Sequence, residues 1–272
     1  MKTILVPVDF SESAKRALHF ARNLSLRIDA KMEVVFFWHP HFDAADPNRL
    51  SPNPELQKIH RQQMDELIKS ENLLPNSGNV IMGFPADSLV ELSKDEKVDL
   101  IVMGARGEHG AIDKLFGTVS SHVSLFAHCP VLIIPENTPH IQNINRIVYG
   151  LEFPYSEEIA IAQVADLAKQ LEADLHFVHI MEEGATLTDE ELQKMYDGIS
   201  KTIPEQQNFH LVTIIGNDEV LEGLEEYARN NQGDLLAVVA RERRWWKRLL
   251  FPNRARKLAL DTDLPLLVVH GR

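Results

Sequence analysis

Residues 4–10 read ILVPVDF, and residues 147–153 repeat this pattern as IVYGLEF. Each run is apolar, ends at an acidic residue and a phenylalanine, and is followed by a serine and an alanine-rich stretch. Further runs recur in the same order: DLIVM (99–103) returns as DLLAV (234–238), and PVLII (130–134) returns as PLLVV (265–269). Because repeated runs in a fixed order indicate a duplicated unit, we predict two copies of one domain in the 272-residue chain. Copy one is residues 1–138, and copy two is residues 144–272.

Short apolar runs alternate with stretches of helical periodicity in each copy. The strands predicted in copy one are residues 2–8, 32–38, 79–82, 99–103 and 131–134. Their apolar character is typical of parallel strands that helices cover on both faces. The first helix is indicated by residues that recur at helical spacing, namely Ala14, Ala17, Leu18, Ala21, Leu24 and Ile28. Five strands alternating with four helices predict an α/β fold of two doubly wound domains, each a five-stranded parallel sheet with helices on both faces.

Local signals predict several helix ends. Asn53 followed by Pro54 is typical of an N-cap and a first-turn proline, and Thr188 with Glu191 has the spacing of a capping box. The apolar stripe of the last helix in copy one is formed by Val119, Val123, Phe126 and Ala127. Residues 39–53 contain prolines and show no period, so we predict an irregular loop there.

The composition narrows the range of functions. A formal net charge of −12 disfavours nonspecific binding to nucleic acid or to an anionic membrane surface. Cys129 is the single cysteine, so we expect no internal disulfide and a small, inert, buried side chain. The first apolar run ends at Asp9, and no run reaches the ~18 apolar residues of a membrane span. We therefore expect a soluble, cytoplasmic protein without a signal peptide.

Two stretches with ligand-binding chemistry follow predicted strands. Asp9 follows the first strand, and Gly104 and Gly107 follow the fourth, with Gly117 and Thr118 after nine more residues. Ligands of such sheets bind beyond the carboxyl ends of the strands. Glycine lets backbone approach a ligand, and a helix that opens at Gly117 offers N–H groups to an anion. The spacing predicts a nucleotide site in which Asp9 accepts from ribose hydroxyls; glycines that merely make turns are the alternative.

These residues resemble the universal stress protein family. The matching stretches are VPVDFS (6–11), MGARG (103–107), GTVS (117–120) and CPVLI (129–133). The resemblance covers the whole chain as two tandem copies. It implies the adenine nucleotide alpha hydrolase-like fold, a role in the stress response, and ATP, with or without Mg²⁺, as the cofactor.

The resemblance also implies how each residue meets the nucleotide. Asp9 would contact the ribose, and the backbone near Val8 and His39 would border the adenine. Backbone around the first two glycines would line the sugar and phosphates, and the start of the last helix would hold the phosphates. The implied contacts are Pro7, Val8, Asp9, His39, Met103, Gly104, Arg106, Gly107, Gly117, Thr118 and Val119.

Copy two lacks this constellation. At the aligned positions it reads ARER (240–243) and NR (253–254), and Glu152 replaces Asp9. Side chains fill the space that bare backbone leaves in copy one. We therefore predict one nucleotide per chain, in copy one, with copy two as a structural or regulatory partner.

Three functions remain open from the sequence. The first is a stress-response protein that binds ATP or a related adenine nucleotide in copy one and has a regulatory or signalling output. The second is a scaffold or protein-interaction module of the same fold that binds no nucleotide. The third is a slow ATPase. The chain lacks the Gly-x4-Gly-Lys-[Ser/Thr] loop, and no lysine or base stands beside the motif, so no catalytic residue is predicted.

Other residue groups are given structural roles. The twelve histidines show no recognised ligand spacing, so no metal site is predicted. Ser11 is expected to cap the helix after Asp9, because no Gly-x-Ser-x-Gly nucleophile motif is present. The basic, aromatic segment 241–257, with Trp245 and Trp246, is either a buried interface or an anion or nucleic-acid surface.

The final strands of the two copies are expected to pair. Residues 131–134 and 266–269 are apolar, and each would be exposed at a sheet edge if it had no neighbour. By analogy with the family, this pairing would make the chain an intramolecular pseudo-dimer, and association of the chain as a homodimer is expected as well. The protein partner that receives its signal is not indicated by any motif.

Overall fold

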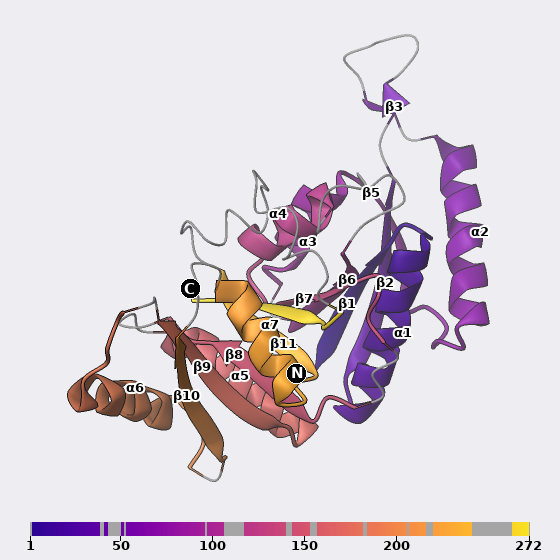
Figure 1. Ribbon diagram of the computed structural model, residues 1–272. Helices are drawn as coiled ribbons and strands as arrows, with labels where there is room; N and C mark the ends of the chain where they lie inside the picture. Colours follow the sequence, from indigo (N-terminus) through magenta and orange to yellow (C-terminus); the bar gives the residue numbers. More distant parts are fainter. Residues whose placement is uncertain are drawn as a thin grey trace.

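The computed structural model describes residues 2–38, 41–42, 50–51, 53–95, 97–105, 117–139, 143–152, 157–181, 184–205, 207–215, 220–240 and 263–271. The strands of copy one are β1 (Thr3–Val8), β2 (Lys31–Trp38), β3 (His41–Phe42), β4 (Leu50–Ser51), β5 (Gly78–Met82), β6 (Leu100–Gly104) and β7 (Val131–Ile134). Those of copy two are β8 (Arg146–Gly150), β9 (Asp174–Met181), β10 (Phe209–Ile215), β11 (Leu235–Ala240) and β12 (Leu266–His270). The helices are α1 (Glu12–Arg27), α2 (Pro54–Ser70), α3 (Pro85–Leu92), α4 (Thr118–Phe126), α5 (Glu158–Leu171), α6 (Asp189–Thr202) and α7 (Val220–Asn230), as labelled in Figure 1. Among the described residues, no helix combines the length and the apolar character that a membrane span needs.

One ten-stranded sheet runs through both copies, in the order β10-β9-β8-β11-β12-β7-β6-β1-β2-β5 (Figure 1). In copy one, β1 lies between β2 and β6, and every neighbouring pair is parallel. Copy two repeats this order with β8 between β9 and β11, again all parallel. The chain reverses its direction of travel across the sheet at the first strand of each copy, which defines a doubly wound fold. The predicted fold class is confirmed.

The last strand of each copy joins the two halves of the sheet. β7 and β12 pair antiparallel, with Leu267 opposite Leu132 and Val268 opposite Val131. These side chains are completely or almost completely buried. The predicted contact between the two final strands is therefore confirmed. Because the junction is antiparallel, the strands of the two copies run in opposite directions, and their carboxyl ends lie on opposite sides of the molecule along the strand axis.

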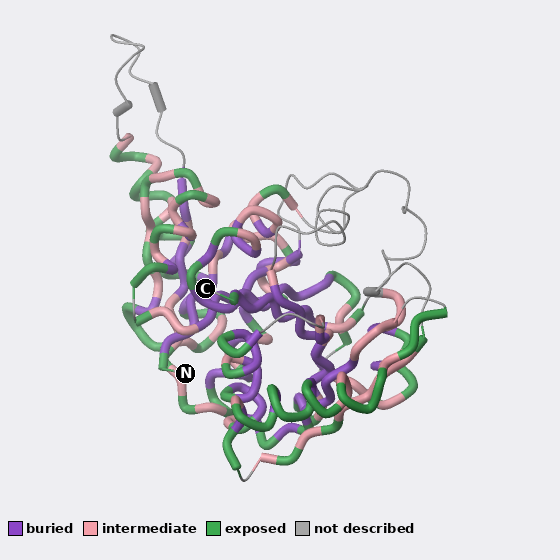
Figure 2. The backbone as a smooth tube through the Cα atoms, turned by 90° about the vertical axis from the view of Figure 1, so that its left-hand side faces the viewer, coloured by how far each residue is buried: buried purple, intermediate pink, exposed green. Residues whose placement is uncertain are grey.

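Helices cover both faces of this sheet. On one face α1, α2, α5 and α6 pack around a buried cluster that extends from Ile4 in β1 to Phe177 in β9. On the other face α3, α4 and α7 contribute Leu89, Val123 and Leu224 to a second cluster. Alternate residues of each strand supply the two clusters, as strand geometry requires. Figure 2 shows the buried sheet enclosed by helices whose outer sides are exposed.

The N-terminal caps predicted for α2 and α6 are confirmed. Asn53 Oδ1 accepts hydrogen bonds from the N–H groups of Glu55 (3.0 Å) and Leu56 (3.3 Å). Thr188 and Glu191 form both bonds of a capping box. Each cap satisfies backbone donors that a helix cannot satisfy internally.

Three details differ from the sequence-based predictions. Strand β5 was expected to be buried on both faces, but it lies at the open edge of the sheet and is half exposed. Phe126, the last residue of α4, is 46% exposed, and its ring lies 4.7 Å from the ring of His122 between centroids. The loop predicted to be irregular contains one short antiparallel pair, β3 with β4. A pair of two-residue strands is too short to leave a period in the sequence.

The fourth helix predicted for copy two falls within residues 241–262, which lie outside the described residues.

Candidate functional site

The strand order brings the predicted site residues of copy one together at the carboxyl ends of neighbouring strands. β1 and β6 are neighbours, with Ile4 opposite Leu100. Asp9 directly follows β1, and Gly104 is the last residue of β6. The connection after β1 enters α1 on one face, and the connection after β6 leads to α4 on the other. Such a point, where strand order reverses, is where doubly wound sheets bind ligands.

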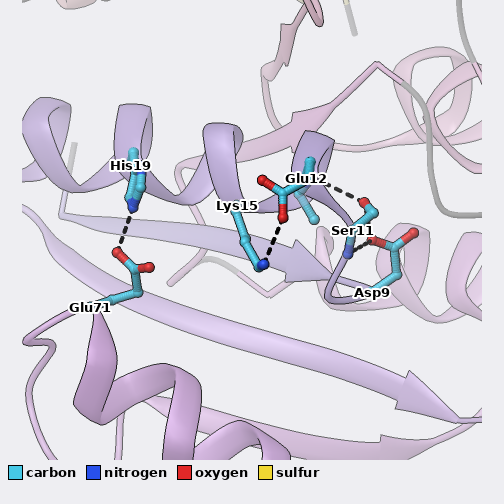
Figure 3. Close-up of polar contacts among 7 residues, drawn as sticks. Asp9, Ser11, Glu12, Lys15, His19 and Glu71 are labelled. Carbon is cyan, nitrogen blue, oxygen red and sulfur yellow. Dashed lines mark hydrogen bonds and ion pairs between the residues drawn. The ribbon is translucent and has the colours of Figure 1, made fainter.

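The turn between β1 and α1 fixes the carboxylate of Asp9 (Figure 3). Phe10 has a φ of 63°, so the chain turns sharply after Asp9 through the left-handed region. Ser11 donates to Asp9 Oδ1 twice, from its backbone N–H at 3.1 Å and from its hydroxyl at 2.5 Å. The hydroxyl oxygen of Ser11 also accepts from the N–H of Ala14 at 3.2 Å, so the predicted capping role of Ser11 is confirmed. Asp9 is half-buried and sits beside the positive end of the α1 dipole.

Gly104 is required by the packing of α1 against β6. A Cβ atom at this position would lie 2.4 Å from Ser13 Oγ and 2.9 Å from the backbone carbon and oxygen of Ser13. The first turn of α1 therefore lies directly on the end of β6, and only a residue without a side chain fits between them. The sequence interpretation assigned this glycine to ligand approach, but helix packing already accounts for it.

The start of α4 is anchored beside Gly104. The N–H of Gly117 donates to the carbonyl oxygen of Ala105 at 2.7 Å, and the hydroxyl of Ser120 donates to the same oxygen at 2.7 Å. Gly117 is the N-cap residue, as predicted, with a φ of −66° and no side-chain cap. Thr118 is exposed at the first helical position. The first turn of α4 thus presents backbone donors and the positive end of its dipole at the carboxyl ends of the strands, where Asp9 also lies.

Of the remaining predicted contacts, four are buried or half-buried, and the others lie outside the described residues. Val8 and Met103 are buried on opposite faces of the sheet, so only their backbones can meet a ligand. Pro7 and Val119 are half-buried. Three predicted contacts lie outside the described residues, namely His39, Arg106 and Gly107.

Sequence reasoning missed the direct bonds from Ser11 to Asp9. The signal was present, because an aspartate two residues before a serine is typical of an Asx turn. It also missed the contact of Ser13 with Gly104; among the described residues the buried Ser13 hydroxyl has no hydrogen-bond partner. Only the three-dimensional contact between α1 and β6 identifies that residue.

The corresponding edge of copy two is built differently. Glu152, which replaces Asp9, is half-buried after β8. The sequence alignment set Ala240 against Gly104, but the strand register corrects this: Gly104 pairs with Ile134 and Val239 pairs with Val269, so the buried Val239 takes the place of Gly104. Glu157 is 3% exposed at the start of α5, and its Oε2 accepts a hydrogen bond from the Tyr149 hydroxyl at 2.6 Å. This bond lies at the start of α5, which is the counterpart of α1 and not of α4, whose first turn is the candidate anion site in copy one. Residues 241–262, including the predicted basic segment and its two tryptophans, lie outside the described residues.

Two further side-chain groups bear on chemistry. Within the described ranges, no three or more His, Cys, Asp or Glu side chains gather where they could hold a metal ion. Cys129 is buried, and burial raises the pKa of its thiol to about 12. The thiol therefore stays protonated and unreactive, as expected from its position before a buried strand.

Comparisons with known proteins agree with this architecture. The model of the universal stress protein family matches residues 1–135 and 143–270. A universal stress protein from Thermus aquaticus is 33% identical over 49% of this chain and 98% of its own length. One from Methanocaldococcus jannaschii is 28% identical over 49% of this chain and 81% of its own. The crystal structure of a universal stress protein from Archaeoglobus fulgidus shares the fold, with a TM-score of 0.68 over 98% of this chain and 96% of that chain at 15% identity.

Proposed function

Because this chain belongs to the universal stress protein family, we propose that it is a cytoplasmic stress-response protein that binds one ATP in copy one and has a regulatory output. Copy one is taken as residues 1–138 and copy two as residues 144–272. Copy two acts as the structural or regulatory partner within an intramolecular pseudo-dimer.

The observation that carries this proposal is that a hydrogen-bond acceptor and a set of hydrogen-bond donors lie at the carboxyl ends of neighbouring strands. Asp9 supplies a fixed carboxylate that accepts from sugar hydroxyls, and it follows β1. The first turn of α4 supplies backbone donors for phosphate oxygens, and it is tied to the end of β6. A nucleotide carries both kinds of group, sugar hydroxyls and phosphates, a few ångströms apart. The residues present therefore fit a nucleotide better than a neutral metabolite.

The stoichiometry follows from the differences between the copies. In copy two, Glu152 replaces Asp9, and residues 234–270 contain no glycine, so the glycine pattern of copy one is not repeated. Side chains therefore stand where copy one offers glycine backbone to a ligand. One nucleotide per chain is the result. Mg²⁺ would be held through the phosphates, because the described residues gather no three or more His, Cys, Asp or Glu side chains that could hold a metal ion on their own.

Isothermal titration calorimetry tests the proposal. We expect one ATP per chain, and we expect Asp9→Ala to weaken binding by about 1–3 kcal/mol, up to roughly a hundredfold, through unpaired ribose hydroxyls. Glu152→Ala is the matched control, because Glu152 holds the equivalent position in copy two; it should leave the affinity unchanged.

Other outcomes would contradict the assignment. Two sites per chain, or an equal loss in the Glu152→Ala variant, would show that copy two binds nucleotide. The absence of binding at millimolar ATP would favour a scaffold of the same fold. Release of phosphate at a rate well above slow turnover would favour an ATPase.

A further inference from the structure

The hydroxyl of Ser11 is bonded on both sides. Its proton is donated to Asp9 Oδ1 at 2.5 Å, and its oxygen accepts the N–H of Ala14 at 3.2 Å (Figure 3). The backbone N–H of Ser11 donates to the same Oδ1 at 3.1 Å. Asp9 is therefore held by two donors from one residue, and that residue is itself fixed by the first turn of α1.

This arrangement removes the freedom of the Asp9 side chain. A carboxylate rotates about two side-chain torsions unless its oxygens are held. Two donors on one oxygen fix both torsions, and hydrogen bonds to a charged acceptor are the strong ones. The left-handed Phe10, at a φ of 63°, brings Ser11 back toward Asp9. The geometry thus sets the direction of the carboxylate before any ligand arrives.

We propose that Ser11 is a positioning residue that orients the Asp9 carboxylate toward the ribose hydroxyls of the nucleotide. The inference rests on the proposed function of copy one. Its consequence is selectivity for the sugar: the protein prefers nucleotides that carry both ribose hydroxyls, and part of this preference depends on a residue that does not contact the ligand. Pre-ordering of the acceptor lowers the entropy lost on binding, which is the general benefit of preorganisation.

A purely structural role for Ser11 makes a different prediction. As the N-cap of α1, Ser11 stabilises the helix whether or not Asp9 binds a ligand. Loss of a cap lowers the stability of the protein and affects all ligands alike. Loss of positioning affects only ligands that use Asp9. The ratio of affinities for ATP and for 2′,3′-dideoxy-ATP separates these effects, because the second ligand lacks both hydroxyls.

The experiment measures both affinities by calorimetry in the full chain. We expect Ser11→Ala to lower the affinity for ATP about three- to tenfold, which is the cost of ordering one side chain. Affinity for 2′,3′-dideoxy-ATP should change little, so the ratio falls. Ser11→Thr keeps the hydroxyl and should restore the ratio. Thr188→Ala is the control, because it removes a hydroxyl cap from α6 in copy two and should leave the ratio as in the wild type.

Each possible result decides one of the two claims. An unchanged ratio in Ser11→Ala, or an equal loss for both ligands, would overturn the positioning role and leave ATP binding intact. A wild-type protein that does not distinguish the two ligands would also overturn it, since Asp9 would then not contact the ribose. A wild-type protein that binds neither ligand contradicts the proposed function itself. Thermal melting of every variant shows that the chain is folded at the temperature of measurement.

Discussion

At the residue scale, His176 on β9 is a titratable group enclosed by other charged groups. Its Nδ1 lies 2.8 Å from the Tyr227 hydroxyl of α7, and its ring centroid lies 4.5 Å from that of His210, its partner on β10. The ion pair between Arg146 Nη2 and Asp174 Oδ2, 3.1 Å apart, also acts on His176 electrostatically. Burial, followed by the positive charges of Arg146 and His210, lowers the pKa of His176 to about 4, and Asp174 opposes this shift. The folded protein therefore keeps this imidazole neutral.

A loss of stability at mildly acid pH follows from this lowered pKa. The unfolded chain takes up a proton at His176 below about pH 6.5, whereas the folded chain resists it until about pH 4. Stability is thus complete above pH 6.5 and falls as the pH drops toward 4. Allowing for screening by solvent, the loss is about 1–2 kcal/mol. Urea titrations at several pH values should show a shallower decline for His176→Gln.

The control for this prediction is His210→Gln. It removes one of the two positive neighbours and leaves the burial of His176, which is the larger cause, in place. Most of the pH dependence should therefore remain. If His176→Gln and the wild type lost stability in parallel between pH 6.5 and 4, the lowered pKa would not be coupled to folding.

At the element scale, the contact between α1 and β6 decides whether the candidate site at the carboxyl ends of β1 and β6 can form. Ser13 in the first turn of α1 lies on Gly104, so any side chain at this position meets helix backbone. The same turn carries Ser11 and the carboxylate that it holds. A shift of α1 away from the sheet would therefore move Asp9 as well. The packing of α1 and the position of Asp9 both depend on one glycine.

Gly104→Ala is expected to lower the free energy of unfolding by about 1–3 kcal/mol in the absence of nucleotide, because the added Cβ lies 2.9 Å from backbone atoms that must move. Gly198→Ala is the matched control. Gly198 lies in α6 with no atom within 4 Å of an added Cβ, and alanine there should stabilise the helix by about 0.5–1 kcal/mol. Thermal and urea unfolding measure both. Wild-type stability of Gly104→Ala without nucleotide would show that the glycine serves the ligand alone.

The sequence was sufficient for the elements and insufficient for some of their contacts. Buried strands such as β1 and β7 were predicted within a residue, because their apolar runs are continuous. The open position of β5 was not predictable, because sheet order depends on contacts between distant residues. At the site, Asp9 and Gly117 were placed by their positions after a strand and before a helix. The packing reason for Gly104 required the structure, because Ser13 is ninety-one positions away along the chain.

At the scale of the whole molecule, the two copies form one body through β7 and β12. The buried cluster beneath α1 and α5 includes residues of both copies. Side chains also cross the junction: Arg27 of α1 donates to the carbonyl oxygen of Leu171 at the end of α5, and His270 Nε2 bonds the carbonyl oxygen of Ser124 in α4 at 3.1 Å. The helix that opens on the proposed phosphate site therefore touches the last strand of copy two. A change in copy two has a direct contact through which it can affect copy one.

This continuity predicts that a cavity in β12 weakens β7 in the other copy. Leu267 lies opposite Leu132 and is 1% exposed, and truncation of such a leucine costs about 2–5 kcal/mol. In Leu267→Ala, amide hydrogen exchange in β7 should accelerate, because part of the cavity lies against that strand. Leu175→Ala is the control: Leu175 is equally buried on β9, which does not adjoin β7, so exchange in β7 should stay near the wild-type rate while β9 and β10 open more often. Acceleration confined to copy two in both variants would mean that the halves open independently, and the contact between β7 and β12 would then hold them together without coupling their stability.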